Sequence, residues 1–383
     1  MPRILSLILA FVVAGGAASA GDGKRDLLDD IRTVAKQGRG TAAGRAAWDR
    51  LAAADAALLP TLLAGMDGAD TAAANWLRTA FDRILDRALA ADGKGIDTDA
   101  LLAFAKDQRR AGRARRLALE VVERLRPGTG KTLFAGWLDD PEFRHDAVAL
   151  ELEHAAALAT KGTKDRAIVA YRKAFGASRD IRQGQLAAAG LLDLGVTTSL
   201  AEHLGFLMDW YLVGPFDAAG MKGFRTAYPP ETKVDLKAQY QGKDGPVRWK
   251  FYRVREPSPK AASRHVALVD LRSREALGDA NDAVAFAYTE FTIPAARVVE
   301  FRGSADDNFT VWVNGERVFG FEEYRNGVRH DRHRFRVPLR AGKNTVLVKV
   351  CQANPEPNWE FFLRLADETG KGIAFQSAVG PGR

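Results

Sequence analysis

The chain has 383 residues, 46% of them hydrophobic, and a formal net charge of +8. This length allows two or three domains with apolar cores. Cys351 is the single cysteine, which excludes an internal disulfide. The mild excess of basic residues suits an anionic surface or polymer but gives no reason to expect a nucleic-acid partner.

The first twenty residues have the pattern of a secretory signal peptide. Arg3 precedes an apolar run over residues 4–13, and small residues lead to Ala18-Ser19-Ala20. The apolar run is about ten residues long, whereas a membrane-spanning helix needs about 20. We therefore expect cleavage after Ala20, export to the periplasm or medium, and no membrane span in the mature chain.

Residues 21–205 are expected to form a helical domain. Apolar residues recur there at three- and four-residue spacing, as in Trp76, Ala80 and Ile84, and short clusters of Gly, Pro and Asp separate segments of helix length. The pattern indicates stacked helical hairpins.

Two segments of this region resemble known helical repeats. Residues 138–148, with Asp140 as a helix cap and Pro141 as the first helical residue, resemble the inter-helix turn of HEAT repeats. Residues 167–175 resemble a tetratricopeptide helix. The resemblance implies an α-solenoid, whose surface ordinarily binds a protein partner.

Residues 206–383 are expected to form an antiparallel β-sandwich, which makes the chain a multidomain α and β protein. β-branched and aromatic residues alternate in short runs, and Asn314-Gly315 between two of them predicts a hairpin. Asn326-Gly327 is a second turn signal. The predicted strands cover residues 210–213, 247–254, 265–271, 283–293, 298–301, 309–313, 317–321, 335–339, 345–351 and 359–365.

Residues 303–315 and 339–350 carry a second resemblance, to the galactose-binding-like jelly rolls that include the sugar-binding domain of β-galactosidases. An acidic turn, a V-W-V-N-G hairpin and an L-x-A-G-x-N turn match that family. The resemblance implies a jelly roll of secreted bacterial proteins that holds a glycan or braces a neighbouring domain.

The acidic turn is the site that this resemblance favours. Asp306, Asp307 and Asn308 could accept hydrogen bonds from sugar hydroxyls, and Trp312 could stack on a sugar ring. The resemblance also suggests calcium at Asp306 and Asp307, as in adhesin-like relatives. The alternative is that the two aspartates cap a tight turn while Trp312 packs in the core or under a loop.

Other motifs are weaker. Gly128-Thr129-Gly130-Lys131-Thr132 is similar to the end of a phosphate-binding loop, but Leu125 stands where a glycine is needed and a helix precedes it instead of a strand. Residues 330–333 look like a metal site, yet their two histidines would face opposite sides of a strand. On that stretch Arg332, Arg334 and Arg336 share one face, which is either a solvated charged face or an anion-binding stripe.

No catalytic constellation, nucleotide site, metal cluster or cofactor motif emerges, and Cys351 in an alternating apolar run is interpreted as a buried, inert thiol. Two functions remain open. One is an exported, non-catalytic binding or scaffold protein. The other is an exported carbohydrate-active enzyme, a glycoside hydrolase or its accessory subunit, whose two carboxylates the sequence does not pair.

Overall fold

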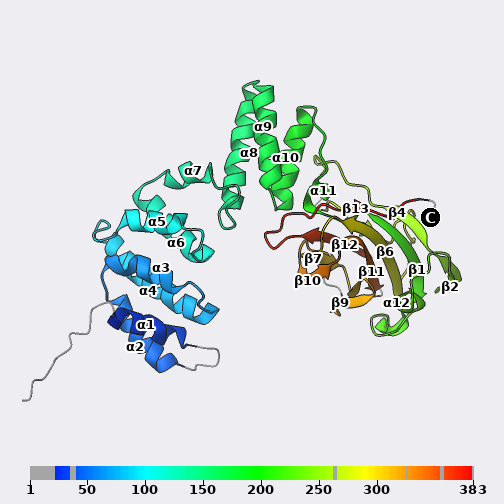
Figure 1. Ribbon diagram of the computed structural model, residues 1–383, viewed down its shortest axis with the longest axis horizontal. Coiled ribbons are helices and arrows are strands. Elements are labelled where there is room, and N and C mark those ends of the chain that lie inside the picture. Colours follow the sequence, from blue (N-terminus) through cyan, green and yellow to red (C-terminus); the bar gives the residue numbers. More distant parts are fainter. Residues whose placement is uncertain (1–21, 35–39, 262–264, 325–326, 354–357, 382–383) are drawn as a thin grey trace, which may run out of the picture. The chain divides into compact units, whose positions relative to one another are not determined.

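The computed structural model describes residues 22–34, 40–261, 265–324, 327–353 and 358–381, and divides into two compact units, Met1–Phe143 and Arg144–Arg383 (Figure 1). Secondary structure changes from helix to strand between Leu204 and Asp209, near the predicted boundary after residue 205. Four helices of the second unit precede that change. The domain boundary at residue 205 therefore stays a prediction.

The first unit is helical throughout its described part. Asp70 caps α4 by accepting a hydrogen bond from the Ala73 amide at 2.8 Å, and Asp97 caps α5 in the same way. The longer helices bury an apolar stripe, which on α4 includes Leu77, Phe81 and Ile84. The helices are α1 (Asp22–Arg32), α2 (Thr41–Ala52), α3 (Leu59–Gly65), α4 (Thr71–Leu89), α5 (Thr98–Lys106), α6 (Gly112–Leu125) and α7 (Thr129–Phe134).

A buried ion pair closes the end of this unit. The Arg115 guanidinium donates to both carboxylate oxygens of Asp140 at 2.6 and 3.1 Å, and both side chains are almost fully buried. Asp140 also accepts hydrogen bonds from the amides of Glu142 and Phe143. Asp140 thus holds the turn before the next helix from within the core and, contrary to the expectation from the sequence, is not the N-cap of that helix. Pro141 is not the first residue of the next helix, since that helix begins at Arg144.

The helices of the second unit are α8 (Arg144–Thr160), α9 (Lys164–Ala177), α10 (Ile181–Asp193), α11 (Leu200–Leu204) and the short α12 (Pro229–Thr232). Small residues let the first three pack closely. Gly190 lies against the Tyr171 ring, where an added Cβ would come within 2.3 Å of a ring carbon. The repeat interpretation stays a prediction. Among the described residues, no helix combines the length and the apolar character that a bilayer crossing requires.

Two antiparallel sheets form the β-sandwich of the second unit (Figure 1). The larger has the order β4-β1-β6-β11-β8-β9, with β13 also paired to β6, and the smaller has the order β10-β7-β12-β5. Their strands are β1 (Asp209–Asp217), β4 (Lys250–Arg253), β5 (Val269–Asp270), β6 (Ala283–Ile293), β7 (Arg297–Ala305), β8 (Phe309–Val313), β9 (Glu316–Phe321), β10 (His333–Leu339), β11 (Gly342–Gln352), β12 (Glu360–Ala366) and β13 (Gln376–Ser377). A separate hairpin consists of β2 (Gln239–Gln241) and β3 (Pro246–Arg248).

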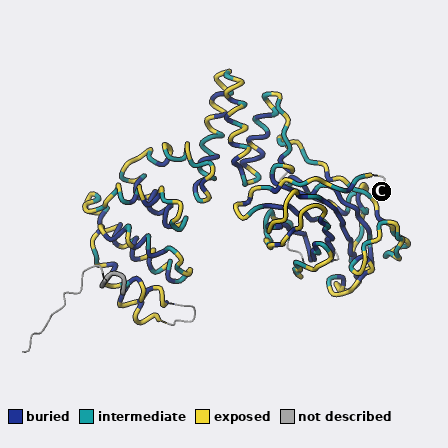
Figure 2. Tube along the Cα trace, viewed as in Figure 1, coloured by how far each residue is buried: buried dark blue, intermediate teal, exposed yellow. Residues whose placement is uncertain are grey.

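The larger sheet is covered on both faces. Its inner face, with Trp210 and Val348, packs on Phe301 and Phe361 of the smaller sheet. Its outer face, with Phe286, packs beneath residues of the β2–β3 hairpin and the loop before it. Burial on both sides explains the nearly unbroken apolar sequence of β6, which is buried over almost its whole length (Figure 2).

The turns that join these strands follow their sequence. Asn314 and Gly315 have φ angles of 53° and 87°, as the two central residues of a type I′ turn require, so the predicted hairpin is confirmed. Buried Asn344 accepts a hydrogen bond from the Asn314 side chain at 2.9 Å. The second turn signal includes Asn326, which lies outside the described residues.

Candidate functional site

The predicted acidic turn lies inside the sandwich. Asp306, Asp307 and Asn308 connect β7 to β8, and their exposed fractions are 4%, 1% and 0%. The Asp307 carboxylate accepts a hydrogen bond from the Ala353 amide at 2.7 Å, and the Asn308 carbonyl accepts one from the Cys351 amide at 2.9 Å. The two carboxylates therefore do not form the exposed tip that binding of a sugar at this turn would require. The geometry matches the alternative, in which the aspartates hold the turn.

Trp312 does not join that turn in one site. Its neighbours Val311 and Val313 point into the inner core, so Trp312 points to the outer face, where it packs half-buried beside Leu347, its partner on β11. The structure does not bring this ring together with the buried carboxylates as a sugar platform.

A row of carboxylates accompanies the turn. Glu360 of β12 is the register partner of Asp270, and its carbonyl accepts a hydrogen bond from the Asp306 amide at 3.0 Å. Burial, together with the Asp306 and Asp270 carboxylates, raises the pKa of Glu360 to about 7. In the described part of the chain, no three His, Cys, Asp or Glu side chains are arranged to hold a metal ion. Calcium at Asp306 and Asp307 stays a prediction.

The string that is similar to a phosphate-binding loop is held by the chain itself. As predicted, a helix, α6, precedes it instead of a strand. The Glu123 carboxylate accepts hydrogen bonds from the amides of Gly128 and Gly130 at 2.6 and 2.7 Å. These bonds lower the pKa of Glu123. A side-chain carboxylate thus occupies the amides that a phosphate would need.

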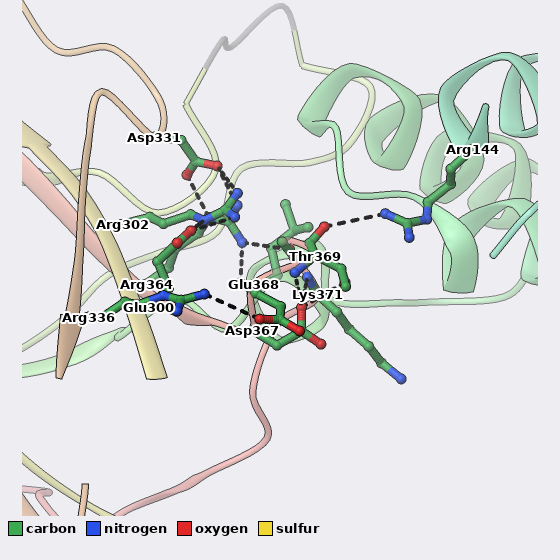
Figure 3. Close-up of polar contacts among 12 residues, drawn as sticks. Arg144, Glu300, Arg302, Asp331, Arg336, Arg364, Asp367, Glu368, Thr369 and Lys371 are labelled. Atoms are coloured by element: carbon green, nitrogen blue, oxygen red, sulfur yellow. Dashed lines mark hydrogen bonds and ion pairs between the residues drawn. The ribbon is translucent and has the colours of Figure 1, made fainter. Parts of the chain in front are cut away.

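The segment with two histidines is the edge of an arginine–carboxylate network (Figure 3). His330 and His333 lie in different aromatic clusters, against Phe362 and Phe321. Between them Asp331 accepts hydrogen bonds from Arg302 at 2.9 Å and Arg364 at 2.7 Å.

This network has a structural role. Burial alone would raise the pKa of Asp331, but its bonds to Arg364 and Arg302 hold that pKa below its usual value. Arg364, almost fully buried, also donates to the carbonyls of Leu204 and Gly370. It thereby joins α11 and the turn after β12 to the smaller sheet.

An open cleft of the second unit lies elsewhere, along one edge of β6. On that edge β1 pairs with β6 as far as Tyr288, and β13 takes over at Phe291. Between the two neighbours the sheet has a gap, and a cleft of about 400 Å³ opens there. It is lined by Glu202, Phe206, Leu207, Met208, Asp209, Thr289, Glu290, Phe291, Ile373, Ala374, Phe375 and Ser377.

Fixed carboxylates line one part of the cleft. Glu290 accepts a hydrogen bond from the Tyr288 hydroxyl at 2.8 Å and pairs with Lys343 at 2.8 Å. Asp209 pairs with both Nε and Nη2 of Arg253, at 2.5 and 3.0 Å. Held in this way, each carboxylate is oriented before any ligand binds.

A buried hydroxyl and an apolar surface complete the lining. Thr289 belongs to the lining and is 2% exposed. The Phe291 and Phe375 rings lie 5.5 Å apart between centroids, and Met208 adds a flexible apolar side chain. An open cleft whose lining combines apolar side chains with a few fixed polar groups is typical of a small-molecule site.

Sequence reasoning missed this cleft. Its walls come from residues 207–209, 289–291 and 373–377, which are distant along the chain. One local signal was available: Thr289 and Glu290 interrupt the apolar run of β6.

No protein-family model and no curated protein matches the chain. Among solved structures, a family 35 carbohydrate binding module from an environmental isolate is 14% identical, with 33% of this chain and 88% of that chain covered and a TM-score of 0.23. A family 35 module from Clostridium thermocellum is 18% identical, with 21% of this chain and 70% of that chain covered and a TM-score of 0.17. A PA14 sugar-binding domain from an RTX adhesin is 12% identical, with 45% of this chain and 95% of that chain covered and a TM-score of 0.25. Similarities this low carry no argument about function, which is therefore argued from the cleft.

Proposed function

We propose that the chain is an exported, non-catalytic binding protein whose sandwich, a jelly roll, holds a carbohydrate in the cleft beside β6. The carrying observation is the pairing of oriented carboxylates, Asp209 and Glu290, with an apolar surface that includes Phe375. Sugars present hydroxyls at their rim and C–H groups on their faces. Carboxylates accept the hydroxyl hydrogen bonds, and aromatic rings cover the C–H faces.

The same geometry argues against hydrolysis. Glycosidases use one carboxyl group as a proton donor beside a second carboxylate. Asp209 and Glu290 each lie in an ion pair with a cationic side chain. That arrangement suits two acceptors of hydrogen bonds. A glycoside hydrolase, or its accessory subunit, is the alternative.

The helical part has a role of its own in this proposal, as an α-solenoid that binds a protein partner. A groove of about 610 Å³ lies in the first unit, between α4 and α6. Met66, Ala74 and Leu117 give it an apolar surface. Its charged lining has three arginines and two glutamates: Arg78, Arg113, Arg116, Glu120 and Glu142. The occupant that fits is an acidic segment of another protein.

The experiment for the cleft is a glycan array followed by calorimetry on the whole chain. Charged hydrogen-bond acceptors contribute about 1.5–3 kcal/mol each. Glu290→Gln should therefore weaken binding of an array hit at least tenfold, which is about 1.4 kcal/mol. Phe375→Ala should have an effect of the same size, because it removes the ring that covers a C–H face of the sugar. The exposed Glu368→Gln is the matched control and should bind as the wild type does.

A second arm separates the cleft from the acidic turn. Asp307→Ala removes the acceptor of the Ala353 amide, so it should lower the melting temperature and leave glycan affinity unaltered. An array without any hit, or wild-type affinity in Glu290→Gln and Phe375→Ala, would contradict the proposal. Turnover of chromogenic glycosides would favour the enzyme.

A further inference from the structure

Helix α11 joins the helices α8 to α10 of the second unit to the β-sandwich. On the sandwich side, the Leu204 carbonyl accepts a hydrogen bond from the buried Arg364 guanidinium at 3.0 Å, and the backbones of Phe206 and Arg364 form an antiparallel bridge. On the helical side, Phe175 of α9 packs against the apolar cluster that contains Leu200 and Leu204. The contact between α9 and α11 is therefore one of the links that hold these helices to the sandwich.

We propose that this contact is a pH-sensitive joint, which loosens when His203 of α11 takes up a proton. The His203 ring lies against the Phe175 ring, with 4.4 Å between the centroids. Its Nε2 atom lies 3.0 Å from the carbonyl oxygen of Ser178, the C-cap of α9. A carbonyl only accepts hydrogen bonds, so Nε2 carries a hydrogen and donates it. The neutral ring thus makes this contact already, and a second proton adds no bond to it.

The charged groups that come closest to this contact are cations. Arg179 follows Ser178 directly in the chain. The Arg364 guanidinium binds the carbonyl of the residue after His203 (Figure 3). Lys371 precedes Gly372, where an added Cβ would come within 2.4 Å of the His203 carbonyl oxygen. A proton on the ring would therefore add a positive charge to a place that already has several.

The carboxylates of the same region are engaged elsewhere. Asp331 is held by Arg364 and a second arginine, and Asp367 accepts hydrogen bonds from two amides of its own turn. Glu202 precedes His203 on α11 and is exposed. In the part of the chain that the structure describes, no ion pair joins the His203 ring to a carboxylate, and its charged neighbours are the three cations.

Burial and these cations act in the same direction. Burial of the ring lowers the pKa of His203 below its usual 6.5, the charges of Arg179, Lys371 and Arg364 lower it further, and the Ser178 carbonyl opposes them. When α11 separates from α9, the ring enters water and its pKa returns toward 6.5. Below pH 6.5 the separated state therefore binds more protons than the closed state. The contact keeps its full stability above that pH and loses stability as the pH falls.

A loosened joint changes more than the contact itself. Two further polar contacts between α8–α10 and the sandwich are exposed, those of Arg144 with the Thr369 carbonyl and of Asp193 with Lys260. Exposed contacts of this kind contribute little to stability. In addition, Glu202 and residues 206–209 form one wall of the cleft beside β6. Separation of α11 from α9 therefore affects both the attachment of the helices and the shape of the cleft, whatever ligand the cleft binds.

Two other histidines lie on the sandwich side of the joint. The His265 and His330 rings are 5.6 Å apart between centroids, and the edge of one ring meets the face of the other between His330 and Phe206, 6.1 Å apart. The test therefore changes His203 and His330 separately, and uses the exposed His154 of α8 as a control.

Hydrogen exchange of the whole chain, followed by mass spectrometry and corrected for the intrinsic rate of each amide, measures the separation. Between pH 7.5 and pH 5 the protection of peptides from residues 175–204 should fall at least threefold, while peptides from β11 keep theirs. In His203→Gln this protection should not change with pH, because the amide still donates to the Ser178 carbonyl but takes up no proton. His330→Gln and His154→Gln should behave as the wild type does.

A second measurement remains decisive if His203→Gln loosens the joint at every pH. The ring resonances of His203, assigned by their absence from the spectrum of that variant, should titrate with a midpoint below 6.5. The exposed Lys371→Gln should raise this midpoint, because it removes a repelling cation. The proposal is overturned by a midpoint at or above 6.5, by wild-type protection that does not change with pH, or by an equal fall in wild type and His203→Gln. Loss of the pH dependence in His330→Gln alone would overturn it as well.

Discussion

At the scale of single residues, Glu360 has the most informative environment. It lies on β12 beside the carboxylates of Asp270 and Asp306, and burial with this repulsion raises its pKa from 4.5 to about 7. Between these two values the folded chain holds a proton that the unfolded chain has released. Its stabilising contribution is therefore complete below pH 4.5 and is lost as the pH rises through 7.

We expect Glu360→Gln to remove this loss. The variant should be more stable than the wild type at pH 8 by about 1–3 kcal/mol, since each pKa unit corresponds to about 1.36 kcal/mol. The two proteins should differ little at pH 4. Calorimetric melting of the whole chain from pH 4 to pH 8 checks this, with exposed Glu368→Gln as the control.

Parallel loss of stability in wild type and Glu360→Gln would contradict the assignment of that pKa.

The same melting curves address the predicted calcium. A divalent cation near Asp306 and Glu360 would offset the repulsion between them. A large rise of the wild-type melting temperature at pH 8 on adding calcium, absent in the variant, would support a cation at this row.

At the scale of elements, the hydrophobic pattern predicts most strands and says little about the site. β6 is predicted at its observed bounds, residues 283–293, because burial on both faces leaves an unbroken apolar run. A strand is predicted over residues 265–271, but only β5 (Val269–Asp270) forms there, because this segment pairs with just two residues of β12. The change of partner along β6, from β1 to β13, leaves no periodic signal, so the cleft could not be predicted.

The burial of the candidate acidic residues could not be predicted for a related reason. A turn between two strands is ordinarily exposed, and Asp306 and Asp307 were expected at such a tip. Tertiary contacts decide otherwise, because Ala353 and Glu360 both form hydrogen bonds with this turn. Alternation along β8 places Trp312 on the outer face, as its spacing from Val311 and Val313 requires.

The groove between α4 and α6 carries a prediction at the same scale. Asn75 and Arg113 both line it and are exposed. A photo-crosslinking amino acid at position 75 should capture an acidic partner in the native host. The same group at Arg50, exposed on α2 outside the groove, should not. Arg113→Glu should abolish the product, because it places a negative charge against an acidic segment. The same product from both positions, or its survival in Arg113→Glu, would remove the groove as the docking site.

At the scale of the whole molecule, a single cysteine means that no internal disulfide supports the fold. Its stability rests on several apolar clusters and on buried pairs such as Arg115–Asp140. Its lone thiol suits an oxidising compartment: Cys351 is 1% exposed, and burial raises its pKa to about 12. A thiol that stays protonated and enclosed reacts slowly with oxidants. The interpretation of Cys351 as buried and inert fits this environment.

Export itself is the last prediction. The apolar run over residues 4–13 is too short to anchor a chain across a bilayer, and Ala18-Ser19-Ala20 offers the small side chains that a signal peptidase accepts. Intact-mass measurement of protein from the native envelope or medium should therefore give a chain that begins at Gly21. Replacing Ala18 and Ala20 by bulky residues should leave the longer, uncleaved chain in the membrane fraction, because cleavage needs small residues at both positions. Mature protein that retains Met1, or full release of the variant, would contradict export by this signal. The carbohydrate ligand would then have to be sought in another compartment.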